Sequence, residues 1–212
     1  MIKKCLLYFF YFILLSGQKK ILIVDNGCAF VPYICKCLKE DLVEYNVVSP
    51  CSTDRDVSEI LSHNFSGIIL SGGPARLSKH VNFKAIIFNC ALLLQAKIPV
   101  LGICLGHQII AMLFGGKVQA FSQMTKKDEK IQFLDRNEPL LKDLKDAEYM
   151  RESHHDCIIS VPHNFMLLAL SASCPVEAVK HRELPLYGVQ FHPEVSGKAG
   201  KQLICNFLSI CC

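Results

Sequence analysis

The segment Gly102-Ile103-Cys104-Leu105-Gly106 places a cysteine between two glycines, at the end of an apolar run that begins at Pro99. A nucleophile on a tight strand-to-helix turn needs small neighbours, and such a turn holds the nucleophile out of the sheet toward a ligand. The N-terminus of the following helix carries partial positive charge, which favours the thiolate form of a cysteine. The pattern therefore predicts that Cys104 is a nucleophile, although a buried cysteine beside a glycine turn gives the same spacing.

A thiolate nucleophile requires a base, and the base requires a group that orients it. Phe191-His192-Pro193-Glu194 ends the apolar run 186–191 and offers both kinds of group. With a proline between them, His192 and Glu194 can face the same side of an extended segment. A lone histidine at a strand end is more often structural, so this assignment depends on the pairing with Cys104. Together the three residues predict a Cys-His-Glu site for acyl transfer.

An acyl-transfer site also needs hydrogen-bond donors for the oxyanion that forms during attack. Ser71-Gly72-Gly73-Pro74 follows another apolar run, and glycine amides can approach a substrate without interference from a Cβ atom. We expect the backbone N–H groups of Gly73 and of Leu105 to be the oxyanion donors, with Gly72 next to the substrate. An ordinary turn is the alternative reading of this glycine pair.

Apolar runs alternate with helical patterns as far as Gly116, and the rhythm changes beyond it. The expected strands are 21–24, 43–49, 67–70, 99–103, 131–134, 148–150, 157–161, 166–170, 176–179 and 186–191, and the expected helices are 31–42, 52–62, 83–96, 105–114 and 197–208. Continuous apolar strands that alternate with helices indicate a parallel sheet covered on both faces. We predict an α/β fold with an open, mostly parallel sheet, additional short antiparallel strands, and ligands at the carboxyl ends of the parallel strands.

The composition narrows the class of protein. The chain has 212 residues, of which 51% are hydrophobic and 20% are charged, and its net charge is +4. These values argue against a disordered protein, and the lack of a run of about five Lys and Arg residues argues against a nucleic-acid partner. The 12 cysteines include no Cys-x-x-Cys pair, so we expect a reduced, cytosolic protein without a metal site.

The N-terminus does not fit the rest of the chain. Residues 5–15 are continuously apolar and follow Lys3 and Lys4, which is typical of a secretory signal. A membrane-proximal anchor, or a start site placed upstream of the true domain, are the alternatives. The run is shorter than the roughly 20 residues of a spanning helix. We therefore divide the chain into an extension, 1–18, and one domain, 19–212.

Three segments carry a resemblance to a known family: 71–74, 102–108 and 190–194. Their order and spacing resemble the motifs of the class I glutamine amidotransferases over about residues 20–210. The resemblance implies that Cys104 attacks the side-chain amide of L-glutamine, that His192 is the base and that Glu194 orients it. Ammonia would leave first, and hydrolysis of a thioester would then release glutamate. The resemblance also implies that Gln108 contacts the glutamine.

Within this family, the segments 25–27, 152–156, 174–178 and 184–190 are similar to those of the free-standing glutaminase subunits of GMP synthases. This similarity implies that Ser153, His154, His155 and Asp156 bind the two ends of glutamine or couple the chain to a partner, and a polar surface loop is the alternative. The subgroup usually reads Gly-Gly-Gln-Tyr where this chain has Gly27-Cys28-Ala29-Phe30. The departure removes a polar contact near the substrate.

The resemblance implies that this chain holds no cofactor and supplies ammonia to a separate ATP-pyrophosphatase subunit, which uses ATP and Mg²⁺ to convert XMP to GMP. It also implies a cytoplasmic location, and membrane association or secretion applies only if residues 1–18 are retained. The alternative functions are an amidotransferase subunit of the anthranilate or aminodeoxychorismate type, a γ-glutamyl hydrolase, and a degenerate regulatory subunit. Ala29 favours the last of these, and the complete set of Cys104, His192 and Glu194 argues against it.

Overall fold

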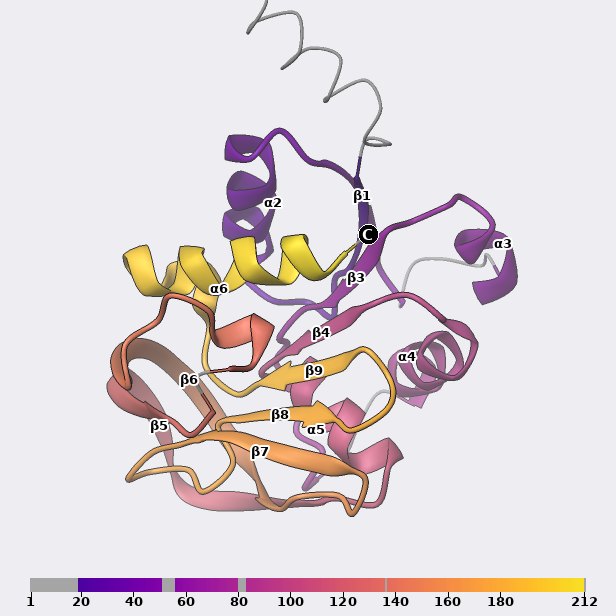
Figure 1. The fold of residues 1–212 in the computed structure, drawn as a ribbon. Helices are drawn as coiled ribbons and strands as arrows, with labels where there is room; N and C mark the ends of the chain where they lie inside the picture. Colours follow the sequence, from indigo (N-terminus) through magenta and orange to yellow (C-terminus); the bar gives the residue numbers. More distant parts are fainter. Residues whose placement is uncertain (1–18, 51–55, 80–82, 136, 212) are drawn as a thin grey trace, which may run out of the picture.

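The computed structural model describes residues 19–50, 56–79, 83–135 and 137–211. They form a nine-stranded sheet in the order β2-β1-β3-β4-β9-β8-β7-β5-β6, with helices on both of its faces (Figure 1). The strands are β1 (Lys20–Val24), β2 (Glu44–Val48), β3 (Gly67–Leu70), β4 (Val100–Ile103), β5 (Lys117–Phe133), β6 (Ala147–Ser160), β7 (Phe165–Leu170), β8 (Ala178–His181) and β9 (Leu186–Val189). The helices are α2 (Val31–Glu40), α3 (Val57–Leu61), α4 (Phe83–Gln95), α5 (Leu105–Leu113) and α6 (Gly197–Ile210), with short 3₁₀ turns η1 (Pro139–Leu141) and η2 (Pro193–Val195).

The first half of the chain builds the parallel part of the sheet. Strands β2, β1, β3, β4 and β9 pair in parallel, and every residue of β3, β4 and β9 is buried. A strand that is covered on both faces can be apolar throughout, which explains why these strands read as continuous apolar runs. The predicted α/β fold with a mostly parallel sheet flanked by helices is confirmed.

Two hydrophobic clusters separate the helices into layers. On one face, α2 and α6 bury residues such as Ile34 and Phe207, and on the other α3, α4 and α5 bury residues such as Leu92 and Ile109. Helix α3 begins at Val57, and its cap is the side chain of Asp56, whereas the cap that we expected at 52–54 lies outside the described residues. Because the parallel strands share one direction, their carboxyl ends lie at one edge of the sheet.

The second half differs from the prediction of short strands. β5 has 17 residues and β6 has 14, and they form one long antiparallel hairpin. The expected strands 131–134, 148–150 and 157–161 are therefore wrong in extent, because charged residues of 126–130 also belong to β5. These residues are mainly exposed and pair across the hairpin, as Arg151 does with Asp128 at 3.0 Å. Cross-strand pairing here replaces the apolar alternation on which a strand prediction depends.

The expectation that every cysteine is reduced is also wrong for one pair. A disulfide joins Cys157 of β6 to Cys174, which lies between β7 and β8. The two residues are 17 positions apart, and the return of the chain through β7 brings them together. The remaining described cysteines are free.

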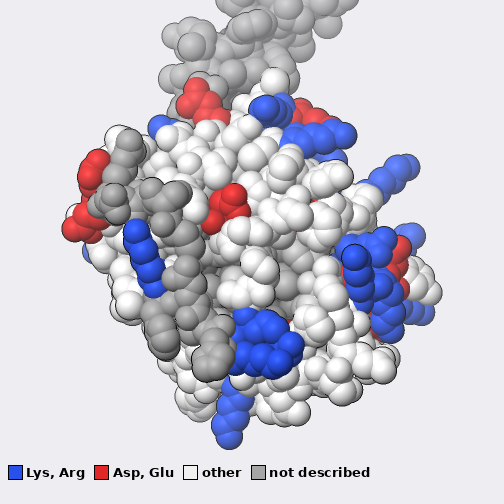
Figure 2. Space-filling view, turned by 180° about the vertical axis from the view of Figure 1, so that it is seen from behind, with Lys and Arg blue, Asp and Glu red and all other residues white. Residues whose placement is uncertain are grey.

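The surface carries both signs of charge. Figure 2 shows Lys and Arg side chains in separate groups on one face, with Asp and Glu side chains beside some of them. Within the described ranges, no helix has the length and apolar character that a membrane span requires. The extension 1–18 that we separated from the domain lies outside the described residues.

Candidate active site

Cys104 lies on a strained turn between β4 and α5. Its φ of 50° and ψ of −101° are uncommon for any residue other than glycine and are typical of strain at functional sites. The turn also needs its two glycines. A Cβ atom on Gly102 would lie 2.5 Å from the carbonyl carbon of Gly106, and a Cβ atom on Gly106 would collide with the carbonyl oxygen of Leu70. The structure thus has the tight glycine-flanked turn that the sequence predicts.

His192 and Glu194 follow β9 and form a buried pair. Nδ1 of His192 lies 2.8 Å from Oε1 of Glu194, and their side chains are only 3% and 0% exposed. The backbone N–H of His192 donates to the carbonyl of Arg151 on β6 at 2.8 Å, and the ring of Phe30 packs edge-on against the imidazole. These contacts fix the ring, and with the Nδ1 proton donated to Glu194 the other nitrogen is left to accept a proton.

The Cys104 side chain rests beside other groups. Its sulfur accepts a hydrogen bond from Nε2 of Gln190 at 3.5 Å and lies 3.9 Å from the carbonyl oxygen of Ser153. No hydrogen bond joins Cys104 to His192 within the described residues. The two face each other across Gly72, because a Cβ atom there would lie 3.5 Å from Cβ of Cys104 and 2.9 Å from Cε1 of His192. Only a glycine leaves this space open.

Burial keeps the resting thiol protonated. Desolvation raises the pKa of Cys104 well above its ordinary value, and the charges of Glu152, Cys28 and Glu194 raise it further. The backbone N–H of Leu105 acts in the opposite direction. The expected stabilisation of thiolate at the start of α5 is therefore present, but it is smaller than the cost of burying a charge.

A pocket of about 420 Å³ opens above these residues. It brings together most of the residues that the sequence indicates, namely Gly73, Cys104, Leu105, Gln108, Ser153, His154, His155, Asp156 and His192. Gly72 and Glu194 are buried and do not belong to the lining. Ala29 and Phe30, the departure noted in the sequence, do line the pocket.

Two of the expected substrate contacts are engaged by the protein itself. The side-chain amide of Gln108 donates to the carbonyl oxygen of Asp156 at 2.7 Å and to Oε1 of Gln190 at 3.0 Å. The carboxylate of Asp156 accepts from the guanidinium of Arg76 at 3.3 Å and from both the N–H and the hydroxyl of Ser78. Asp156 thereby holds the loop that follows Gly73 against β6.

A second His–Glu pair lies on the inner side of β6. Nε2 of His154 is 3.1 Å from Oε2 of Glu152, and Nδ1 of His154 lies 3.0 Å from the carbonyl oxygen of Asp156. Burial raises the pKa of Glu152 to about 8. Burial, together with the charge of Glu152, raises that of Glu177 to about 9. Desolvation lowers the pKa of His154, so this cluster is built from neutral groups.

The comparisons with known proteins agree with this geometry. The family described as Glutamine amidotransferase class-I matches residues 22–211. The chain belongs to the class I glutamine amidotransferases. It is 41% identical to the glutamine-hydrolysing subunit of GMP synthase from Pyrococcus abyssi over 192 residues, which cover 90% of this chain and 98% of that protein. The corresponding GMP synthase subunit from Methanocaldococcus jannaschii is 40% identical over 90% of this chain and 97% of its own length.

Solved structures agree with the family. A crystal structure from Thermoplasma acidophilum, described as that of a proposed GMP synthase subunit, has a TM-score of 0.83 and 31% identity and covers 92% of this amidotransferase and 95% of that chain. A glutamine amidotransferase from Thermotoga maritima has a TM-score of 0.71 at 18% identity, over 92% of this chain and 84% of that one. The second likeness concerns the fold.

Sequence reasoning missed two residues of this amidotransferase. Gln190 stands directly before the His-Pro-Glu segment, and its amide bridges Gln108 and the Cys104 sulfur. Cys28 lies in the loop after β1, and its sulfur, a nitrogen of His192 and a carboxylate oxygen of Glu194 are all within 4.8 Å of one another. Among the described residues, this trio is the group whose atoms could hold a metal ion. Nothing in the spacing of Cys28 indicates this position.

Proposed function

We propose that this amidotransferase hydrolyses L-glutamine through Cys104, His192 and Glu194, and supplies the ammonia to a separate ATP-dependent subunit that converts XMP to GMP. The observation that carries the proposal is the strained turn at Cys104, which places the thiol on the same pocket as His192. A backbone conformation that costs free energy persists only where the surrounding structure enforces it, and such positions cluster at active sites.

In the proposed reaction, the sulfur of Cys104 attacks the side-chain carbonyl carbon of glutamine and its proton passes to the free ring nitrogen of His192. Glu194, on the other nitrogen, stabilises the imidazolium that forms. The N–H groups of Gly73 and Leu105 hold the oxyanion. His192 then returns the proton to the leaving amine, which departs as ammonia. Water, activated by the same histidine, hydrolyses the thioester to glutamate and restores the thiol.

The resting geometry supports a slow enzyme in isolation. The Cys104 thiol is protonated by burial, and its sulfur interacts with Gln190 and Ser153 instead of His192. Substrate or a partner must therefore favour the arrangement in which sulfur and imidazole meet. A coupling free energy of about 1–3 kcal/mol would raise the rate about 5- to 150-fold.

The choice of ammonia acceptor rests on the relatives. Proteins about 40% identical over nearly their whole length are glutamine-hydrolysing subunits of GMP synthases, and this favours GMP synthesis over the anthranilate, aminodeoxychorismate and γ-glutamyl hydrolase alternatives. In this scheme the chain needs no cofactor, whereas ATP and Mg²⁺ act on the partner subunit. The substrates of such a reaction are cytoplasmic, which is where we place the protein.

The experiment measures glutamate release by the purified chain, first alone and then with an ATP-pyrophosphatase subunit, ATP, Mg²⁺ and XMP. We expect GMP to form from glutamine, and glutamate release to rise when the loaded partner is added. The Cys104→Ala variant should lose glutamine-dependent GMP formation while GMP formation from added ammonia continues.

Cys90→Ala is the matched control, because Cys90 is a free cysteine on α4 and does not line the pocket. It should retain glutamine-dependent activity. Activity of Cys104→Ala with glutamine would refute the nucleophile. Full glutaminase activity that the loaded partner leaves unchanged would instead identify a free-standing hydrolase.

A further inference from the structure

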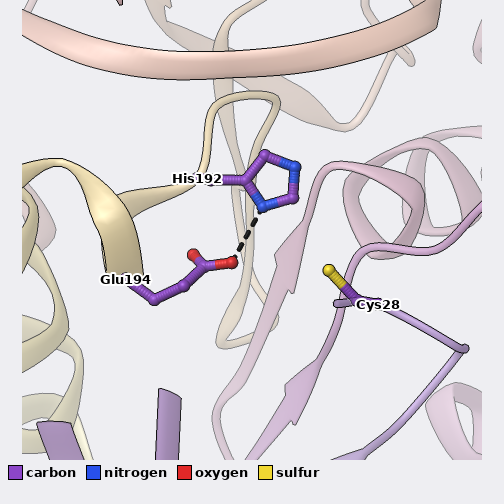
Figure 3. Close-up of side chains that lie close together, drawn as sticks. All are labelled: Cys28, His192 and Glu194. Carbon is purple, nitrogen blue, oxygen red and sulfur yellow. Dashed lines mark hydrogen bonds and ion pairs between the residues drawn. The ribbon is translucent and has the colours of Figure 1, made fainter. Parts of the chain in front are cut away.

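Three side chains of different chemistry converge beside the pocket. Cys28 comes from the loop after β1, and Figure 3 shows its thiol pointing toward the space next to the His192 ring and the Glu194 carboxylate. The sulfur, a ring nitrogen and a carboxylate oxygen lie within 4.8 Å of one another. His192 and Glu194 are only 2% and 7% exposed, so two of the three groups are held in place by packing.

We propose that Cys28, His192 and Glu194 form a binding site for a zinc ion, which holds the catalytic base and thereby inhibits the enzyme. Thiolate, imidazole and carboxylate are the three ligand types that Zn²⁺ takes in proteins. Mg²⁺ and Ca²⁺ prefer sites made of oxygen atoms alone. Three protein ligands leave a fourth tetrahedral position, which faces the pocket that Cys28 and His192 line.

An unpartnered oxygen provides independent support. Oε1 of Glu194 pairs with His192, but Oε2 is buried without any hydrogen-bond partner. A buried carboxylate oxygen in this state costs free energy, because it has lost its water and gained nothing in return. A cation between Glu194 and Cys28 would satisfy that oxygen.

The loop around Cys28 is suited to a metal-bound thiolate. The backbone N–H of Phe30 donates to the Cys28 sulfur at 3.4 Å, and such donors stabilise negative charge on sulfur. Burial raises the pKa of the free thiol to about 11, so binding of zinc would displace the thiol proton and release it to solvent. The observed spacing needs a small closure, because zinc bonds of about 2.0–2.3 Å place tetrahedral ligand atoms roughly 3.5 Å apart. Rotation of the Cys28 side chain can supply it.

The inhibitory consequence rests on the proposed function. A zinc ion on a ring nitrogen of His192 stops this ring from relaying the Cys104 proton to the leaving amine. The ion would also occupy space that the glutamine side chain needs. This inhibition depends on Cys28, at a position where the subgroup's usual sequence has another residue, and it differs from attack of the metal on the nucleophile Cys104.

The direct test of the site uses Co²⁺, whose bond to a thiolate gives a near-ultraviolet charge-transfer band. We expect this band in the wild type, in Cys104→Ala and in the control Cys90→Ser, and its loss in Cys28→Ser. Competition with a chelating indicator should show one Zn²⁺ equivalent that is lost only in Cys28→Ser. A band that persists in Cys28→Ser and disappears in Cys104→Ala would overturn the proposal, because the metal would then be on the nucleophile.

The functional test compares glutaminase activity with and without Zn²⁺, each variant being normalised to its own metal-free rate. Zinc should reduce the wild-type and Cys90→Ser rates at least tenfold, and a chelator should restore them, whereas the Cys28→Ser rate should change less than twofold. Equal inhibition of Cys28→Ser contradicts the proposal. If no variant releases glutamate, the proposed function fails, and the cobalt band still decides whether the metal site exists. Circular dichroism and the thermal midpoint of each variant establish that it folds.

Discussion

Two buried His–Glu pairs lie on either side of the nucleophile, and they differ in what surrounds them. His192 and Glu194 border the pocket, and Nδ1 and Oε1 are 2.8 Å apart. His154 and Glu152 lie behind β6, where the two side chains are 1% and 0% exposed. The inner pair also contacts a second carboxyl group, Glu177, whose charge interacts with both of its members.

The comparison shows that the same two residue types acquire different chemistry from their surroundings. Behind β6, burial raises the pKa of Glu152 to about 8 and that of Glu177 to about 9, because two carboxylates without water cannot both be charged. Neutral carboxyl groups fill space and share hydrogen bonds. The pair at the pocket contains one carboxyl group and one imidazole with a free nitrogen, which is the arrangement that can accept a proton from Cys104 and return it.

The largest expected effect separates the two histidines. His192→Ala should lower kcat for glutamine hydrolysis about 10²- to 10⁴-fold, because a positioned base contributes that much to proton transfer. His154→Ala should mainly lower stability, by about 1–3 kcal/mol, because it leaves buried partners unsatisfied. Steady-state kinetics and urea unfolding of both variants provide the measurements. An equal loss of kcat in a stably folded His154→Ala variant would show that both pairs take part in catalysis.

The disulfide provides the next test, because it spans the inner side only. Cys157 follows Asp156 on β6, and Cys174 precedes Glu177 by a few residues. Closing a loop across 17 positions stabilises a fold by about 3 kcal/mol. The double variant Cys157→Ser/Cys174→Ser should lose up to about that amount in urea unfolding and should no longer respond to a reducing agent. Cys35→Ser is the control. Titration of all cysteines as free thiols in the unfolded wild type would contradict the pairing.

The parallel half of this fold could be predicted because its signal is local. Each buried strand is a continuous apolar run, and the helices between them have their own periodicity, so strand order follows from simple connections. The turn at Cys104 could also be predicted, because the required glycines are its neighbours in the chain. The His192–Glu194 pair has the same advantage, since two residues of one segment need no knowledge of the fold.

The remaining features depend on contacts between distant segments. β5 contains charged residues such as Lys127 and Asp128 and is a strand because β6 pairs with it. Glu177 meets Glu152 only through the sheet, and Cys28 meets His192 only because β1 and β9 end at the same edge. No periodicity or short motif contains these pairings, and propensity is overridden by tertiary packing in such cases.

The pH dependence of stability sharpens the contrast between the two sides. Glu177 has a pKa near 9 in the folded chain and about 4.3 when unfolded, so between these values the folded state binds more protons than the unfolded state. Its contribution is complete below about pH 4.3 and is lost as the pH rises toward 9, with a slope of up to about 1.4 kcal/mol per pH unit. Glu177→Gln mimics the protonated form and should flatten this decline.

Urea unfolding between pH 5.5 and 8.5 measures the slope. Glutamine keeps an oxygen for the hydroxyl of Ser171, which donates to Oε1 of Glu177 at 2.6 Å, so the variant should match the wild type at low pH and exceed it at high pH. Glu40→Gln, an exposed change on α2, should leave the slope unaltered. A wild-type stability that rises across this range would show that Glu177 ionises normally.

The smallest expected effect lies where the inner side meets the pocket. The carboxylate of Asp156 holds the loop after Gly73 through Arg76 and Ser78. Asp156→Asn keeps the shape of the side chain but removes the charge, which weakens a charge-assisted hydrogen bond by an amount that allows roughly a tenfold change in loop order. The oxyanion donor Gly73 is adjacent to this loop, so the apparent KM for glutamine should rise up to about tenfold.

The same change should affect kcat less, because Cys104 and the His192–Glu194 pair keep their own supports. Arg76→Met removes the ion pair from the other side and serves as the matched variant, since it should reproduce the rise in KM without altering β6. Increasing the salt concentration should weaken the wild type only slightly, because Asp156 is buried and its pair is poorly screened. If Asp156→Asn raises KM and Arg76→Met does not, the carboxylate acts on glutamine directly. The role implied by the family resemblance would then replace loop anchoring as the explanation of this residue.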